Sequence, residues 1–134
     1  MMTPKKILYK KEYAKELLRI AKGDLESAEK LFAAKGGRPE NVCFLAQQVI
    51  EKSIKAVLCH GQIPYSHTHD LGTLIELLPK NLEPLPLGYD LSVLNEYATI
   101  RLYEDGIVDL KQEDVEAVID IAKKSFFWGT RIIG

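Results

Sequence analysis

The stretch from Leu45 to Cys59 constrains the fold more than any other part of the chain. Placed on a helix at about 100° per residue, the apolar residues of this region cover well over half of the circumference. They are Val42, Leu45, Ala46, Val49, Ile50, Ile54, Ala56, Val57 and Cys59. A helix with so wide an apolar surface cannot lie on the outside of a protein. We therefore expect it at the centre of a helical bundle.

The remaining arc of this helix is hydrophilic, with Phe44 and Leu58 near its two ends. We call it the polar ridge, and it consists of Gln47, Gln48, Glu51, Lys52 and Lys55. Burying such groups without partners is unfavourable, so we expect the polar ridge to face groups that can pair with it. Gln48, Lys52 and Lys55 supply donors suited to phosphate. The plain alternative is a solvated edge on which Glu51 and Lys55 form an ordinary i,i+4 pair.

The first half of the chain predicts two antiparallel helices. The first runs from about Lys11 to Ala34, where apolar residues recur at spacings of three and four, and Gly36-Gly37 ends it. Pro39 suits the first turn of the central helix, and Gly61 ends that helix. The short linker makes the two helices antiparallel neighbours.

The second half predicts three more helices. Thr68 or Asp70 caps a short helix that closes at Pro79, another starts near Asp90, and the last runs from Gln112 to about Gly129. No stretch of alternating β-branched residues competes with this assignment, and no internal repeat is visible. The sequence predicts an all-α, up-and-down bundle of four or five helices, a single domain over residues 1–134.

The proline-rich segment, the two cysteines and the N-terminus bear on packing and compartment. The segment Pro79–Gly88 holds three prolines but is apolar, so we expect it to pack across the bundle. Cys43 and Cys59 lie on one helix, about 24 Å apart along it, so they cannot pair within the chain and are expected as buried thiols. The N-terminus lacks the apolar core of a signal peptide, and no apolar run reaches the ~20 residues of a membrane span, which favours a cytoplasmic protein.

Charge is distributed unevenly along the chain although the formal net charge is -1. Residues 1–22 have a local balance of +5, and residues 81–120 have one of -8. This polarity favours complementary partners, or contact between copies in an oligomer, over indiscriminate nucleic-acid binding. The alternative is two solvated helix faces.

Arg101 lies on the apolar stripe of the helix predicted from Asp90. An unpaired buried charge costs several kcal/mol, so its guanidinium needs a partner. The polar ridge offers Glu51, or the acceptor atoms of Gln47 and Gln48, within one subunit or across a dimer. In the alternative, the long side chain reaches out to solvent at a helix end.

Several motifs together resemble the HEPN domain family over nearly the whole chain. They are Ala21…Asp24-Leu25…Ala28, the run from Cys43 to Leu58 with Gln-Gln-Val-Ile-Glu-Lys-Ser-Ile-Lys-Ala at its centre, Thr68-His69-Asp70-Leu71, and Arg101. The resemblance implies a bundle of four or five helices that usually dimerises. It also implies frequent pairing with a minimal nucleotidyltransferase encoded alongside, in prokaryotic toxin–antitoxin or related defence systems.

Many HEPN proteins are metal-independent ribonucleases with an Arg-x(4–6)-His motif doubled at the dimer interface. Arg101 matches the arginine, but Gly106, Ile107 and Val108 occupy the positions of the histidine. No histidine follows His69. The general acid–base group, typically worth 10²–10⁴-fold, is therefore missing.

Tyr103, Glu104 and Asp105 follow Arg101 closely, but a tyrosine of ordinary pKa is a poor base near neutrality. We therefore expect a dimeric, non-catalytic module that binds a nucleotide, RNA or a partner protein. A ribonuclease with a degenerate site at Arg101 and Tyr103 is the alternative, and a homodimeric scaffold is a third reading. The expected binding residues are Gln48, Glu51, Lys52, Lys55, His69 and Arg101.

His67 and His69 form a His-x-His pair. Two histidines without an evident third ligand make a thin case for a metal, and we expect neither a metal nor a cofactor. In its Thr-His-Asp-Leu setting, the resemblance instead implies that His69 packs against the central helix and orders the loop. Asp70 would then cap the next helix.

Overall fold

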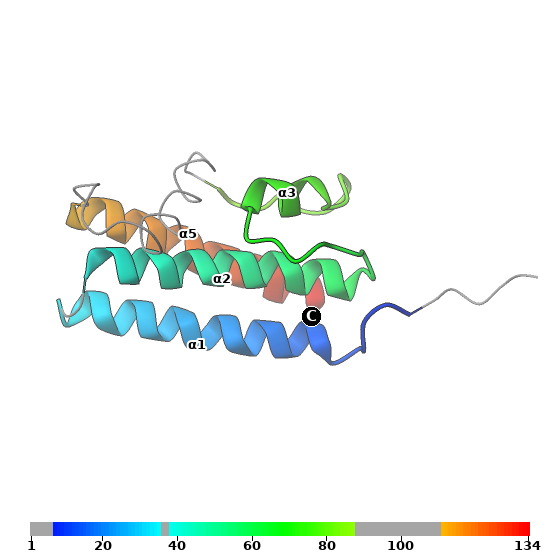
Figure 1. The fold of residues 1–134 in the computed structure, drawn as a ribbon, viewed down its shortest axis with the longest axis horizontal. Coiled ribbons are helices and arrows are strands. Elements are labelled where there is room, and N and C mark those ends of the chain that lie inside the picture. The colour runs from blue at the N-terminus through cyan, green and yellow to red at the C-terminus, as the bar shows by residue number, and fades with distance from the viewer. Residues whose placement is uncertain (1–6, 36–37, 88–110) are drawn as a thin grey trace, which may run out of the picture.

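The computed structural model describes residues 7–35, 38–87 and 111–134. These ranges contain four helices and no strand, namely α1 (Tyr13–Ala33), α2 (Pro39–His60), α3 (Leu71–Glu76) and α5 (Gln112–Ile133) (Figure 1). The prediction of an all-α bundle is confirmed. The helix expected to start near Asp90 lies outside the described residues, and so do Arg101 and Tyr103.

The three long helices lie side by side, with α1 antiparallel to both α2 and α5 (Figure 1). Helix α2 contacts all three other helices, and α1 also contacts α5 directly. The short α3 lies on the side of α2 opposite α1 (Figure 1). Helix α2 is therefore central in the bundle, as its wide apolar surface predicts.

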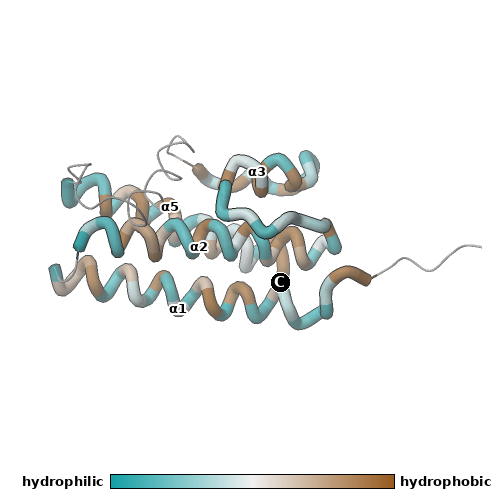
Figure 2. Tube along the Cα trace, in the orientation of Figure 1, coloured by the Kyte–Doolittle hydropathy of each residue, from teal (hydrophilic) through white to brown (hydrophobic). Residues whose placement is uncertain are grey.

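The core is built by apolar faces that meet around α2, and apolar residues recur along each long helix (Figure 2). Small residues let the helices approach closely: Ala21 and Ala28 of α1 are completely buried. A Cβ at Gly129 of α5 would lie 3.3 Å from a methyl carbon of Leu18 and 3.6 Å from the backbone oxygen of Ser53. Glycine at this position therefore brings α5 close to both α1 and α2.

This packing role explains one difference from the sequence prediction. We expected the last helix to end near Gly129, because glycine commonly follows a helix C-terminus. Helix α5 instead continues to Ile133. Gly129 is buried within it, so this glycine serves contact between helices and does not end one. The predicted starts at Pro39 and Gln112 agree with the structure.

The proline-rich segment packs on the bundle as expected, as far as residue 87. Leu82, Leu85 and Leu87 are partly buried against the main core. The indole nitrogen of the fully buried Trp128 donates a 2.7 Å hydrogen bond to the carbonyl oxygen of Glu83, and the Glu83 carboxylate pairs with Arg131 at 2.8 Å. These contacts attach the segment to the C-terminal half of α5.

Candidate functional site

The polar ridge of α2 is organised around the carboxylate of Glu51, whose side chain is only 3% exposed. The ammonium of Lys55 lies 3.0 Å from one carboxylate oxygen. Nδ1 of His69 lies 2.9 and 3.1 Å from the two oxygens. An ionised carboxylate only accepts hydrogen bonds, so Nδ1 carries the proton and donates it. We call Glu51, Lys55 and His69 the Glu51 cluster.

The loop before α3 positions His69. Asp70 caps α3, because one of its carboxylate oxygens accepts from the backbone N–H of Gly72 at 3.2 Å and the other from the hydroxyl of Thr73 at 2.7 Å. The Thr68 hydroxyl accepts from the backbone N–H of Asp70 at 3.1 Å. The expected roles of Asp70 as a cap and of His69 as the contact with the central helix are both confirmed.

Lys55 is held on its other side by an aromatic ring. Its side chain is 14% exposed, and the ammonium lies 5.7 Å from the ring centroid of Tyr65, a favourable cation–π distance. The Tyr65 hydroxyl lies 3.4 Å from the Cys59 sulfur. Burial raises the pKa of both the Tyr65 hydroxyl and the Cys59 thiol. Sequence reasoning missed Tyr65, because its loop has no periodicity that relates it to Lys55.

Lys52 points to a different neighbour. It pairs with Asp24 of α1, and both side chains are 23% exposed. The polar ridge is therefore divided: Lys52 joins α2 to α1, whereas Glu51 and Lys55 face the loop before α3. Gln48 is partly buried. The i,i+4 pair of Glu51 and Lys55 forms as the alternative interpretation expected, but the edge is not solvated, since Glu51 is buried and both lysines are paired and largely covered.

Gln47 lies one helical turn before Glu51 and is completely buried. Neither atom of its amide has a hydrogen-bond partner in the part of the chain that the structure describes. An unsatisfied buried polar group costs about 1–3 kcal/mol, so this amide is suited to a further contact. The hypothesised contact of Arg101 with Gln47, Gln48 or Glu51 falls on a residue outside the described ranges.

The His-x-His pair does not gather further ligands in the described ranges. His67 is exposed, and Nδ1 of His69 is already engaged by Glu51. Among residues 7–35, 38–87 and 111–134, no three or more His, Cys, Asp or Glu side chains come together in a way that could hold a metal ion. Cys43 and Cys59 are buried free thiols, as predicted.

The bundle and the Glu51 cluster, whose carboxylate is buried, define a helical protein in which a loop histidine is held on a central helix. Comparison with protein families identifies it more closely, since the model of the HEPN domain matches residues 14–132. The chain belongs to the HEPN family, and membership indicates a nucleotide- or RNA-related function. Comparison with curated proteins gave no match, and comparison with solved structures gave none either. None of the described helices has the length and hydropathy needed to cross a membrane.

Proposed function

We propose that this HEPN protein is a non-catalytic, homodimeric module that binds a nucleotide or RNA. In this proposal it works in the cytoplasm of a prokaryote, paired with a minimal nucleotidyltransferase in a toxin–antitoxin-like system. One observation carries the non-catalytic assignment: positions 106, 107 and 108, where a HEPN ribonuclease has its histidine, are Gly, Ile and Val. The acid–base group expected beside Arg101 is therefore missing.

The proposed binding surface is the exposed side of the Glu51 cluster together with Arg101. The His69 side chain is 75% exposed, so it can contact a ligand while Glu51 fixes its orientation. Arg101 supplies a cation for phosphate, and Gln47 and Glu51 supply acceptors that can hold its guanidinium. Gln48 and Lys55 complete the set of donors on α2, whereas Lys52, although expected among them, pairs with Asp24 of α1 and is not part of this surface.

The test is binding of a labelled single-stranded RNA oligonucleotide and of labelled ATP to the purified protein at several salt concentrations. We expect binding that weakens as salt rises, because phosphate contacts release counterions. Arg101→Ala and His69→Ala should each weaken it at least about tenfold, the loss expected for one charge-assisted hydrogen bond of ~1.4 kcal/mol or more. His67→Ala, two residues from His69, is the matched control. Wild-type affinity in both test variants would overturn the proposed surface.

A second candidate function, a ribonuclease, is favoured by the geometry of His69. Its Nδ1 is held by a buried carboxylate, an arrangement that orients a catalytic imidazole in hydrolases. Its other ring nitrogen has no hydrogen bond within the described residues. This nitrogen could act as the base that the Arg101 motif lacks. Cleavage of single-stranded RNA, abolished by His69→Ala and Arg101→Ala but not by His67→Ala, would support this candidate over the first.

A further inference from the structure

The segment of residues 7–12, which precedes α1, is attached to the loop between α2 and α3 by the side chain of Gln62. We call this segment the strap. The amide oxygen of Gln62 accepts from the backbone N–H groups of Leu8 at 2.9 Å and Tyr9 at 3.0 Å. The amide nitrogen donates to the carbonyl oxygen of Tyr9 at 3.0 Å. Three hydrogen bonds from one side chain therefore hold the backbone of the strap.

The backbone conformation at Gln62 indicates that this side chain has a specific role. Its φ is +57°, and it lies two residues after the end of α2. The N–H of Gln62 donates to the carbonyl oxygen of Cys59, and the next N–H, of Ile63, donates to that of Leu58. This pattern is a Schellman motif, whose left-handed position is usually glycine because a side chain is strained there. Glutamine is therefore unfavourable for the turn itself, and its bonds to the strap offset that cost.

Tyr9 attaches the strap to the same loop a second time. Its hydroxyl donates to the carbonyl oxygen of Ile63 at 3.2 Å. Its ring stacks on the ring of Tyr65, with centroids 5.7 Å apart and planes inclined by 16°. Both rings also pack against buried residues of α1 and α2. The beginning of the loop, from Gln62 to Tyr65, is therefore held by the strap.

The same loop carries His69, and Tyr65 connects the strap to the Glu51 cluster. The Lys55 ammonium lies 5.7 Å from the centroid of the Tyr65 ring. Lys55 and His69 in turn share the carboxylate of Glu51. Asp70 fixes the end of the loop by capping α3. The strap supplies contacts at the beginning of the loop, so His69 lies between two points of attachment.

We propose that the strap positions His69, with Tyr9 and Gln62 as the positioning residues. The attached strap holds the Tyr65 ring beside the lysine of the Glu51 cluster, and the cluster keeps the Nδ1–H of His69 on its carboxylate. Release of the strap frees the beginning of the loop, and His69 loses its fixed orientation. The inference rests on the proposed function, in which His69 contacts the ligand, and it names what controls that contact.

The first test observes His69 directly, through the nitrogen NMR shifts of its imidazole, which distinguish the two ring nitrogens. In the wild type we expect one tautomer, with the proton on Nδ1. The released variant, Gln62→Gly with Tyr9→Ala, should shift His69 toward the mixed pattern expected of His67, the exposed histidine two residues away. Hydrogen exchange of the strap amides should accelerate about tenfold or more. Tyr9→Phe alone keeps the stacked ring and should retain the wild-type pattern.

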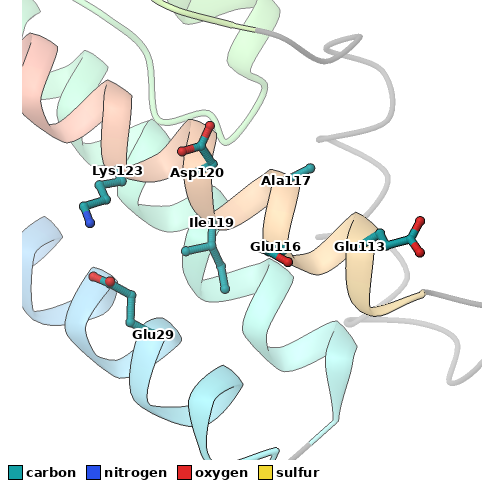
Figure 3. A pocket seen from close by; sticks show the side chains of 7 residues that line it. All are labelled: Glu29, Glu113, Glu116, Ala117, Ile119, Asp120 and Lys123. Atoms are coloured by element: carbon teal, nitrogen blue, oxygen red, sulfur yellow. The ribbon is translucent and has the colours of Figure 1, made fainter.

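Two controls change the protein where the strap is not attached. Lys35 follows α1 with a φ of +53°, so Lys35→Gly relieves comparable backbone strain without removing a bond to the strap. Glu29→Ala alters a groove between α1 and α5, about 24 Å along α1 from Tyr13 (Figure 3). Neither control should change the His69 pattern. Helical circular dichroism should show wild-type helix content in the released variant.

Binding of labelled RNA and labelled ATP tests the consequence for the ligand. If release leaves His69 in place about a third of the time, the apparent Kd rises about threefold. The same release in a His69→Ala background should add no further loss, because the strap acts through that side chain.

The inference fails if His69 shows the mixed pattern in the wild type, or if its pattern is unchanged in the released variant. It also fails if release weakens binding equally in the His69→Ala background. A wild type that binds neither RNA nor ATP would refute the proposed function instead. The imidazole shifts would then still decide whether the strap positions His69.

Discussion

Helices α2 and α5 are equal in length but differ in how they use their side chains. Each has 22 residues, of which 13 are buried in α2 and eight in α5. Two charged residues of α2 bind groups inside the molecule. Glu51 contacts Lys55 and His69, and Lys52 contacts Asp24 of α1. Helix α5 keeps a charged stripe on its outer face. Polar residues on the central helix therefore set the internal geometry of the fold, whereas those on the peripheral helix remain available to another molecule.

The contrast is sharpest between two neighbouring aromatic residues of α5. Trp128→Ala should lower the free energy of unfolding by about 3–5 kcal/mol, because it empties a fully buried site and removes the hydrogen bond to Glu83. Phe127→Ala, on the outer stripe, should cost less than about 1 kcal/mol. Urea unfolding followed by helical circular dichroism measures both. Similar losses in the two variants would mean that the two sides of α5 do not differ as described.

Two glutamates compare α2 with α5 directly. Glu51→Ala should cost about 2–3 kcal/mol, because Lys55 and His69 lose the buried carboxylate that they share, although the exposure of His69 moderates the loss. Glu116→Ala on the outer face of α5 should change stability by no more than about 0.5 kcal/mol. The same urea titration decides, and a Glu51 variant as stable as the Glu116 variant would contradict an internal role for the polar ridge.

Cys43, one of the two buried thiols of α2, predicts a dependence of stability on alkaline pH. Burial raises the pKa of the Cys43 thiol to about 12 from its ordinary value of 9.0, so the folded state retains a proton that the unfolded state has lost. Its contribution is complete below pH 9 and disappears as pH rises toward 12. Stability should fall over this range by about 1.4 kcal/mol per pH unit from this group. Cys43→Ala should flatten the fall in unfolding titrations, and an unchanged slope would exclude Cys43 as its source.

Two ion pairs provide the smallest contrast. Lys52 and Asp24 are 23% exposed, whereas the α5 pair of Lys124 and Asp120, 2.9 Å apart, has exposures of 61% and 57%. Double-mutant cycles to alanine should give a coupling of about 0.5–1 kcal/mol for the first pair and about 0.3 kcal/mol for the second. Equal couplings would show that the tie between α2 and α1 adds nothing beyond a surface pair.

Much of the fold could be predicted from local patterns. Pro39 indicated where α2 starts. The wide apolar surface of α2 predicted that this helix lies at the centre of the bundle. The resemblance of Thr68-His69-Asp70-Leu71 supplied the contact of His69 with the central helix and the cap by Asp70. Periodicity placed α2 at the centre because it reports burial within one element, and Pro39 marked its start because proline favours the first turn of a helix.

Pairings between elements could not be predicted in the same way. Nothing in the order of residues relates Lys52 to Asp24, or Lys55 to the ring of Tyr65, since these contacts depend on how the helices and loops are aligned in space. Gly129 was misread for a related reason. A glycine that ends a helix and one that lets two helices touch look alike in a sequence, and only the packing of Leu18 and Ser53 distinguishes them.

The hydrogen bond between Trp128 and the carbonyl of Glu83 makes the protein its own optical reporter. This chain contains one tryptophan, so its fluorescence comes from a single indole whose N–H is tied to the proline-rich segment. Release of that segment would hydrate the ring and shift its emission to the red before the helices melt. The indole can therefore reveal whether a ligand or a second protein loosens this side of the molecule, with no label added.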